Sequence, residues 1–455
     1  MCTRDRDIEI TKEIVQRYLN LHSTDVAKLD KLDRYYRGKH DILHRSKEND
    51  LANNRLVCNH AKHITDTAVG YLVGNPVTYK SDLDLDALLD WAKRADVDTE
   101  DMDIAKDASV FGRAYELVYM SDDENPSPRV TVIDPRNAFA VYDDTVEHSP
   151  VFGVYYYPVY GPYNTIEKYK GQYIRRDKIV AFTATSSRAI EREEAPFTNP
   201  FGMVTLIEYS NNEEQQGDFE QVISLIDAYN ILQSDRVNDK QQFVEAILLI
   251  KGQTLGDDAD EESEAYRNLR KYGLLMLDKD SSAEWLTRTF DESSVEILRS
   301  SIEQDIHKFT GIPCMTDDNF AGNTSGVAMK YKLLGFEQVT KIKERYMRDG
   351  LKYRLRLFCA MLGIKGMPAV DPEQIEIVFT RALPANELEL AQVVATLQGM
   401  VPDATLLSLL PFVGDAQQAA DELQAQKEES VRLQQQAFAA TANTPPEDVS
   451  EDDEE

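Results

Sequence analysis

Residues 218–243 carry the pattern that most limits how this chain can fold, a long helix with an apolar stripe. Val222, Leu225, Ile226, Tyr229 and Leu232 recur at the helical spacing i, i+3, i+4 and i+7. Twenty-six residues at about 1.5 Å each make a helix of roughly 39 Å. The apolar surface of such a long helix is larger than a single narrow chain can cover. We therefore expect neighbouring copies of the chain to bury this surface.

A compact β–α–β–β pattern follows this helix and leads to a second long helix, predicted over 291–310. The apolar runs of the insert are AILLIKG, LLMLDKD and EWLTRTF, and an acidic helical segment, EESEAYRNLRKYG, follows the first of them. A third long helical stretch covers 325–363 and is expected to kink near Gly335 or Gly350, because glycine weakens a helix locally.

The remaining segments alternate between helical and β-type regions, so the fold class is α+β. From 113 to 209, short β-type runs rich in tyrosine are separated by turns, which predicts antiparallel sheet. The last fifteen residues combine proline with acidic residues and should be disordered. Helical periodicity is found in 8–45, 59–74, 83–111, 386–399 and 415–438, and a further strand is predicted over 375–383.

The stretch NFAGNTSGVAMK (319–330) raises the question of a phosphate-binding loop. A P-loop needs four residues between its glycines and Lys-Ser/Thr directly after the second. Here three residues separate Gly322 from Gly326, and Lys330 comes too late. The approach to this stretch has helical spacing rather than that of a strand. The glycines therefore indicate a flexible loop that opens a helix, and we expect the chain to hydrolyse no nucleotide.

Histidines and cysteines between residues 22 and 63 offer one alternative, a metal-dependent hydrolase. His40 and His44 lie at i, i+4, and CNHAKH adds Cys58, His60 and His63. The Glu of a metalloprotease HExxH motif is missing, and no second cysteine pair completes a zinc site. There is no G-x-S-x-G elbow either, and nothing in the sequence supplies Cys314 with a base. The sequence therefore favours no enzyme, no cofactor and no metal.

The charge balance is strongly acidic, with 80 acidic and 50 basic residues and a net charge of −30. The last fifteen residues hold seven acids and no bases, so the net charge without them is −23. Affinity for nucleic acid comes mainly from Lys and Arg, so a lone DNA-binding protein of this composition would be unusual. An acidic scaffold that recruits partners through its tail is a second alternative.

One helical stretch departs from this balance. Residues 325–363 contain nine bases and three acids, a net charge of +6. They form either a solvated face that pairs with acidic neighbours or a contact surface for nucleic acid or an acidic subunit. The apolar runs are too short to span a bilayer, and the first residues lack the apolar segment of a signal peptide. Four widely spaced cysteines indicate reduced thiols.

Five stretches, taken in order, make the chain resemble the portal proteins of long-tailed bacteriophages. They cover the chain from about residue 10 to 430. The matching segments are YYRGKHDIL (35–43), NNRLVCNHAKHITDTAVGYLVGNPVTY (53–79), LIDAYNILQSDRVND (225–239), GIPCMTDDNFAGNTSGVAMKYKLLGFEQ (311–338) and LLSLLPFVGD (406–415).

The resemblance implies a ring subunit divided into wing, stem, clip and crown. It implies an N-terminal wing (1–217), stem helices (218–245 and 291–310), a clip (246–290), a tunnel loop (311–326), a kinked wing helix with a strand (327–384), a helical crown (385–440) and a disordered tail (441–455). The loop would place on the tunnel wall Asp317, Asp318, Asn319, Phe320, Ala321, Gly322, Asn323 and Thr324. Gly311 and Gly326 would be its hinges, and Gly335 would be the wing-helix kink.

The same resemblance implies a function and partners. Twelve subunits would form a ring at one capsid vertex, where double-stranded DNA enters during packaging and leaves during ejection. The partners would be the terminase large subunit, which supplies the ATPase, the major capsid and scaffolding proteins, and a head-completion adaptor. The protein would lie in the virion, and in the host cytoplasm during assembly, without a membrane. An electronegative tunnel would repel the duplex and leave it free to slide, whereas fixed cations would hold its phosphates.

Overall fold

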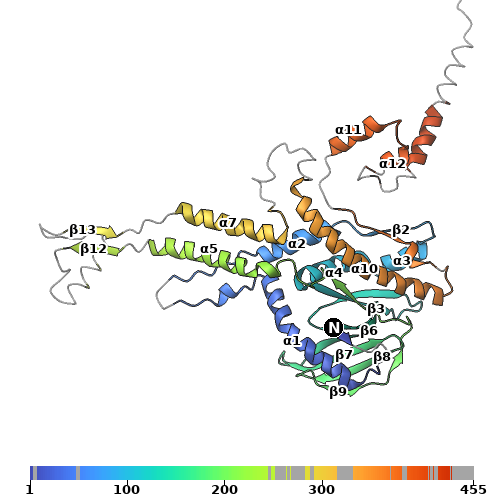
Figure 1. Ribbon diagram of the computed structural model, residues 1–455, viewed down its shortest axis with the longest axis horizontal. Coiled ribbons are helices and arrows are strands. Elements are labelled where there is room, and N and C mark those ends of the chain that lie inside the picture. The colour runs from blue at the N-terminus through green and yellow to red at the C-terminus, as the bar shows by residue number, and fades with distance from the viewer. Residues whose placement is uncertain are drawn as a thin grey trace, which may run out of the picture. The chain divides into compact units, whose positions relative to one another are not determined.

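The computed structural model contains one large unit, Met1–Ala382, and a smaller C-terminal one, Leu383–Glu455. The residues it describes are 1–3, 8–47, 52–243, 247–251, 263, 267, 282–286, 292–314, 331–368, 370–381, 387–407, 409, 413, 419–430 and 432. Within them helices and sheets mix, as an α+β protein requires (Figure 1). No helix in this part of the chain is long and apolar enough to cross a membrane.

Four helices form the N-terminal part of the large unit. They are α1 (Lys12–Tyr36), α2 (His60–Val73), α3 (Asp86–Arg94) and α4 (Val97–Phe111), with a short 3-10 helix at Asp41–His44. Helix α2 begins where the side chain of Asn59 accepts a hydrogen bond from the Lys62 amide and ends at Gly74, as predicted. Gly112 ends α4 with φ +80°, and a Cβ there would overlap the backbone of Gln215.

Two antiparallel sheets follow, which confirms the predicted β region. The smaller has the order β11-β3-β4, and the larger has the order β1-β5-β6-β7-β8-β10, with β9 paired to β8 and β1 joined to β5 in parallel. The strands are β1 (Cys2–Thr3), β3 (Arg113–Met120), β4 (Pro128–Ile133), β5 (Ala138–Asp143), β6 (Pro150–Tyr160), β7 (Ile166–Arg175), β8 (Lys178–Thr185), β9 (Ile190–Glu193), β10 (Phe197–Thr198) and β11 (Leu206–Ser210).

Alternating burial explains how the larger sheet packs. Along β8, Val180, Phe182 and Ala184 are buried, whereas the residues between them are partly exposed. This apolar face shares a core with Val15 and Leu19 of α1, so α1 covers the sheet. The tyrosines differ in role, because Tyr156 is buried whereas Tyr157, Tyr160 and Tyr163 are exposed.

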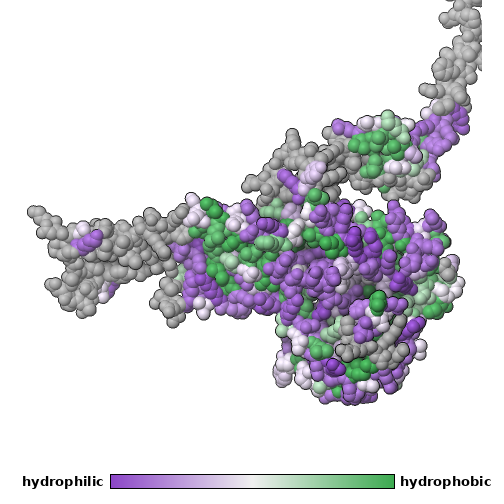
Figure 2. All heavy atoms as spheres, in the orientation of Figure 1, coloured by the Kyte–Doolittle hydropathy of each residue, from purple (hydrophilic) through white to green (hydrophobic). Residues whose placement is uncertain are grey.

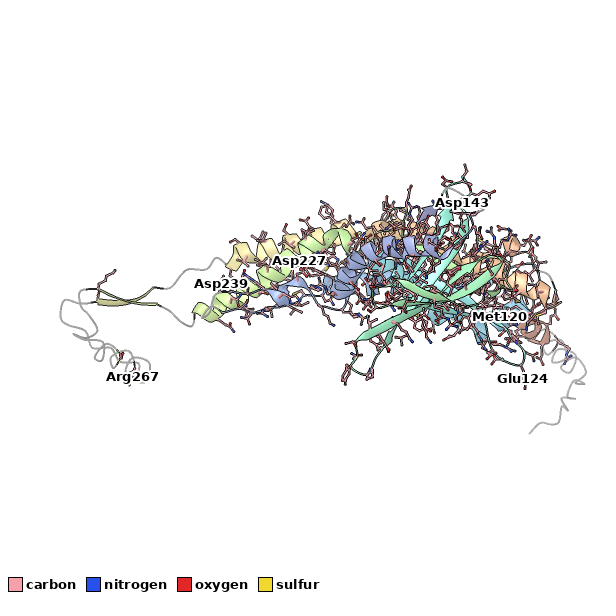
Figure 3. All side chains as sticks on the ribbon, turned by 90° about the horizontal axis from the view of Figure 1, so that it is seen from below. Met120, Glu124, Asp143, Asp227, Asp239 and Arg267 are labelled. Carbon is pink, nitrogen blue, oxygen red and sulfur yellow. The ribbon has the colours of Figure 1, made fainter. Side chains whose placement is uncertain are left out.

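Two long helices pack side by side and antiparallel: α5 (Ile223–Phe243) and α7 (Glu292–Thr310). Figure 3 labels Asp227 and Asp239 along α5 and shows α7 beside it. The predicted helix start at 218 was too early, because Glu220–Val222 forms a 3-10 turn that buries Phe219 and Val222. Between these helices, β12 (Ile247–Lys251) and β13 (Ser282–Leu286) form an antiparallel pair. The predicted strand LLMLDKD lies outside the described residues.

Helix α10 (Leu334–Ile364) closes the core of the large unit. Leu351, Leu355 and Phe358 pack against α2, α3, α4 and the smaller sheet. Gly350 does not interrupt α10, because the ring of Tyr209 covers it. Gly335 lies in the first turn, and a kink there stays a prediction. The strand predicted over 375–383 is shorter, β14 (Glu376–Val378), because its partner β2 (Thr78–Lys80) has only three residues.

The smaller unit is helical where the structure describes it. It contains α11 (Glu387–Leu397) and α12 (Asp403–Leu407), separated by Gly399 with φ +85°, and residues 419–430 are also helical. Lys427 pairs with Asp403 at 2.8 Å, which ties this last helix to α12. The rest of the predicted helix 415–438 and the acidic tail 441–455 lie outside the described residues.

Candidate functional site between helices α7 and α10

Most residues proposed to line the tunnel fall in the segment 315–330, which the structure does not describe. They are Asp317, Asp318, Asn319, Phe320, Ala321, Gly322, Asn323, Thr324 and the second hinge, Gly326. The described residues on either side, up to Cys314 and from Tyr331 onward, form the two roots of this loop. These roots determine from where the loop projects.

The first root is the C-terminal end of α7. Thr310 ends the helix and donates its hydroxyl to the Ile306 carbonyl at 2.9 Å. Gly311 follows with φ +70°, where a side chain would be strained, and a Cβ would lie 3.0 Å from Val339. His307 Nδ1 lies 3.0 Å from the Ile312 carbonyl, so the chain turns back onto the helix directly after Gly311. The residue predicted as the first hinge therefore has a backbone conformation that favours glycine.

The second root is the start of α10. Phe336 is buried and stacks on Tyr71 of α2, with ring centroids 4.4 Å apart. The Tyr71 hydroxyl donates to Glu337 at 2.7 Å, and Arg381 donates to the same carboxylate at 3.1 Å. Arg381 and Tyr71 hold the pKa of Glu337 below its ordinary value, although burial opposes them. This root is therefore fixed by packing and by charge.

Both roots belong to one hydrophobic core. Ile306 and Ile312 from the α7 side share a cluster with Leu333 and Phe336 from the α10 side. The described segments on both sides of the loop are therefore anchored in the same core, although Tyr331, next to the loop, is exposed. The same cluster includes residues of α1, α2 and α5, together with Val222, Ile226 and Tyr229 of the apolar stripe predicted over 218–243. The chain buries these stripe residues itself, so the expectation that neighbouring subunits would bury them was wrong.

Helix α5 carries a row of buried polar side chains that periodicity alone does not reveal. Asn230, Ser234 and Asn238 lie at i, i+4 and i+8 and are buried. Their oxygens accept hydrogen bonds from the backbone amides of Cys58, Leu56 and Asn54, at 2.8, 3.0 and 2.7 Å. Four residues of a helix advance about 6.0 Å, and two residues of an extended chain advance about 6.6 Å. The spacing of the three side chains along α5 therefore matches the spacing of the three amides along the segment 54–58. We call these three side chains the polar row.

Ion pairs at the surface connect α5 to α7. Arg236 contacts Glu292 at 3.2 Å and Glu296 at 3.0 Å, and Lys240 contacts Glu292 at 2.8 Å. Arg299 donates to the Tyr229 hydroxyl at 3.1 Å. Exposed apolar side chains, Ile231, Ile297 and Leu298, lie on the same two helices. Figure 2 shows hydrophobic side chains gathered over this part of the visible face.

The structure separates the histidines that the sequence groups together. His40 is buried against the Tyr35 ring, its Nε2 donates to the Tyr35 carbonyl at 2.9 Å, and its Nδ1 accepts from Asn230 at 2.8 Å. Both ring nitrogens are therefore used by the fold, and His44 is exposed. These contacts do not favour metal binding by His40 and His44.

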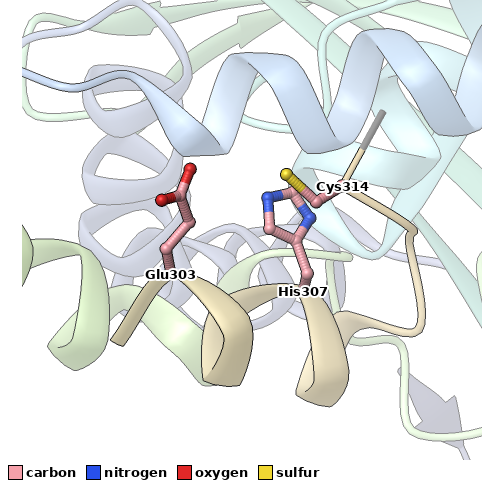
Figure 4. Close-up of side chains that lie close together, drawn as sticks. All are labelled: Glu303, His307 and Cys314. Carbon is pink, nitrogen blue, oxygen red and sulfur yellow. The ribbon is translucent and has the colours of Figure 1, made fainter. Parts of the chain in front are cut away.

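The other members of the group face residues that the sequence did not associate with them. Cys58, His60 and His63 line one pocket with Glu303, His307 and Cys314. Figure 4 shows the last three of these side chains. Burial lowers the pKa of His60 to about 4, and burial also lowers the pKa of His307, so both rings are neutral at pH 7. Glu303 and His307 lie at i, i+4 on α7, and that spacing was the available signal.

Several bases of α10 pair with acidic neighbours. Lys343 forms an ion pair with Asp218, Arg348 with Glu344 at 2.5 Å, and Arg356 with Glu373 at 2.6 Å. Arg354 lies in the core with Asp101 and Glu116. Among the described residues, these contacts favour the interpretation of a helix face paired within the chain.

Comparisons with known proteins agree with the resemblance. Residues 15–433 match the family described as phage portal protein, SPP1 Gp6-like. The portal protein of Clostridium phage phiCD119 is 24% identical over 85% of this chain and 89% of that protein. The portal protein of Bacillus phage SPP1 is 23% identical over 94% of this chain and 90% of that protein.

Among solved structures, a chain from the neck of a native GTA particle covers 77% of this chain and 89% of its own length, with 13% identity and a TM-score of 0.43. The family match spans most of the chain and includes both loop roots, both long helices and the polar row. The chain therefore belongs to the SPP1 Gp6-like family of phage portal proteins.

Proposed function

We propose that this chain forms a ring, with twelve subunits, at one vertex of the capsid and conducts double-stranded DNA into the head and out of it. Membership of the portal family carries this proposal. A separate terminase would dock on the ring and supply the energy. Capsid and scaffolding proteins and a head-completion adaptor would be the other partners, during assembly in the host cytoplasm and in the virion.

In this proposal the large unit provides the wing and the stem. The helix pair α5 and α7 is the stem, β12 and β13 belong to the clip, and residues 385–440 form the crown. The exposed Ile231, Ile297 and Leu298 support the stem assignment, because apolar side chains gathered on a thin helix pair suit a neighbouring subunit. Twelve chains of 51.7 kDa would give a particle of about 620 kDa.

The loop 311–326 would be the part that meets the DNA. Its roots support this role, since a buried core anchors both sides and Gly311 has a positive φ, the backbone conformation that glycine adopts without strain. Asp317 and Asp318 would repeat around the ring as a negative collar. Repulsion from all sides would keep the duplex centred and would prevent the counterion release that makes phosphate binding tight.

Replacing Asp317 and Asp318 by lysine tests the loop assignment. The change is +4 per subunit and about +48 in a ring of twelve, so repulsion should become adhesion with a steeper salt dependence. We expect normal rings and procapsids by electron microscopy, because a loop lining an aqueous channel contributes little buried area. Packaging should be slow or incomplete.

The double variant Asp122→Lys, Asp123→Lys is the matched control, because it makes the same charge change on the exposed loop between β3 and β4, whose tip Glu124 is labelled in Figure 3. It should package as the unmodified protein does. Wild-type rate and length in the loop variant would show that the DNA is handled elsewhere. A stable monomer in native mass measurements at micromolar concentration would contradict the ring itself.

A further inference from the structure

Glu303, His307 and Cys314 bring three different metal-ligating groups to the first root of the loop. One donor atom from each lies within 4.8 Å of the other two. Glu303 and His307 occupy successive turns of α7, and Cys314 follows the turn at Gly311 (Figure 4). A thiolate, an imidazole and a carboxylate together form a donor set that suits zinc.

The hydrogen bond of His307 leaves the ligating nitrogen available. A backbone carbonyl can only accept, so Nδ1, which lies 3.0 Å from the Ile312 carbonyl, carries the ring proton. Nε2 then keeps its lone pair. Metal-bound histidines commonly hold their second nitrogen in this way, because the hydrogen bond fixes both the tautomer and the ring orientation.

Glu303 is held in a comparable manner. Arg299, one turn earlier on α7, donates to Glu303 Oε2 at 2.6 Å. The other carboxylate oxygen can face the pocket while this contact orients the group. His63 on α2 is exposed, and its ring centroid lies 6.0 Å from that of His307. It is therefore in a position to approach as a fourth ligand.

We propose that Glu303, His307 and Cys314 bind a zinc-class divalent ion, with His63 completing a tetrahedral site. Ligand bonds of about 2.0–2.3 Å place neighbouring donors of a tetrahedron roughly 3.5 Å apart. The present separations within 4.8 Å require the donors to close by about 1 Å. Rotation of the long Glu303 side chain and of the segment after Gly311 supplies this movement.

Binding would fix the position at which the loop leaves the protein. Cys314 is the last described residue before the loop, and the ion would tie it to α7 across the Gly311 turn. The ion would thus restrict the loop at its Gly311 side and leave Gly326 as the remaining proposed hinge. The effect on DNA handling rests on the proposed function, whereas metal binding itself does not.

Titration of assembled, chelator-treated protein with Co²⁺ and then Zn²⁺ tests the site. One Co²⁺ ion should bind per chain and give a thiolate-to-cobalt charge-transfer absorption together with the intense visible bands of a tetrahedral ion. Zn²⁺ should displace Co²⁺ and abolish both signals. Cys314→Ser should remove the charge-transfer band. His307→Ala and Glu303→Gln should weaken Zn²⁺ binding by more than about 100-fold, and His63→Ala by about 10-fold or more. Mg²⁺, which prefers oxygen ligands, should not compete.

His44→Ala is the matched control, because it removes an exposed histidine outside the cluster and should bind Co²⁺ as the unmodified protein does. Cys314→Ser and Glu303→Gln are conservative, so ring formation by electron microscopy reports that they fold. A Co²⁺ spectrum without a thiolate band, or equal Zn²⁺ affinity in Cys314→Ser rings, would overturn the proposal. Normal metal binding by rings that package no DNA would instead count against the proposed function alone.

Discussion

Arg354 in α10 and Arg236 in α5 each hold two carboxylates, but in opposite surroundings. The Arg354 side chain is 2% exposed and lies 2.6 Å from Asp101 and 2.8 Å from Glu116, which are 3% and 0% exposed. Arg236 is 23% exposed, and its partners Glu292 and Glu296 are 53% and 45% exposed. The same chemical pairing is therefore dry around Arg354, in the proposed wing, and exposed to water in the helix pair, the proposed stem.

The difference shows how each region keeps its shape. Burial is strong enough to raise the pKa of Asp101 to about 6, even though Arg354 attracts its charge. Removal of one partner in the wing would strand charges that water cannot reach. In the helix pair, water and other side chains replace a lost partner at once. The buried cluster therefore fixes one geometry, whereas the helix pair can exchange contacts, as the proposed stem, shared between subunits, would need to do.

Arg354→Met should have the largest effect of the changes that test this contrast. It leaves the carboxylates of Asp101 and Glu116 buried without their cation, at a cost of about 3–5 kcal/mol. We expect poor folding, measured as a lower midpoint of urea unfolding at fixed protein concentration. Replacing Asp101 and Glu116 by leucine as well should recover much of the stability, because a buried ion cluster contributes little over apolar packing. If Arg354→Met alone were as stable as the parent, the contrast between the buried and the exposed ion pairs would be wrong.

Gly350→Ala tests whether the buried cluster of Arg354, Asp101 and Glu116 tolerates the displacement of a neighbouring side chain. A Cβ at this position would overlap the ring of Tyr209, whose hydroxyl donates to Glu116 at 2.6 Å. Moving that ring disturbs the hydrogen bond and the packing together, so we expect a loss of about 1–3 kcal/mol in urea unfolding. Gly363→Ala is the control, since a Cβ there meets no atom within 4 Å. Equal stability of the two variants would mean that the core yields easily.

Asn230→Ala extends the comparison to an uncharged interaction that is buried in the helix pair. The variant leaves the Cys58 amide without its acceptor and His40 without the Asn230 donor. Unsatisfied buried groups cost about 1–3 kcal/mol, so the loss should resemble that of the wing variants rather than that of the surface ion pairs. Gln233→Ala, on the same helix but only partly buried, should be close to neutral. A neutral Asn230→Ala would mean that the segment 54–58 is held by other contacts.

The sequence predicted what local periodicity determines. The extent of α2, its end at Gly74 and the β region follow from spacing, proline and glycine within a few residues. The polar row could not be predicted in the same way. Asn230, Ser234 and Asn238 interrupt the apolar pattern of α5, and their partners near Cys58 lie about 180 residues away in the chain. Their i, i+4, i+8 spacing can be seen in the sequence, but no local feature identifies the backbone segment that these side chains bind.

The histidines show the same limit. His40–His44 and Glu303–His307 have the same i, i+4 spacing, and the sequence drew attention to the first pair because cysteines and further histidines lie near it. The fold buries His40 against Tyr35 and instead brings Glu303 and His307 to Cys314. Burial and the turn at Gly311 decide this outcome, and neither can be read from the spacing of the ligands. The tunnel residues 317–324 stay a prediction.

Arg236→Ala should have the smallest effect. Its contacts to Glu292 and Glu296 are exposed, and Lys240 lies 2.8 Å from Glu292 and can keep that carboxylate paired. At low salt we expect a slight decrease in the midpoint of urea unfolding. At about 1 M salt, where the Debye length is about 3 Å, the difference from the parent should vanish. Arg354→Met should keep its full loss at the same salt, because ions do not enter a buried cluster. Parallel titrations of the two variants in low and high salt measure this directly. A salt-independent loss in Arg236→Ala would show that the subunit interface desolvates this ion pair in the assembled ring, and the stem would then be as dry as the wing.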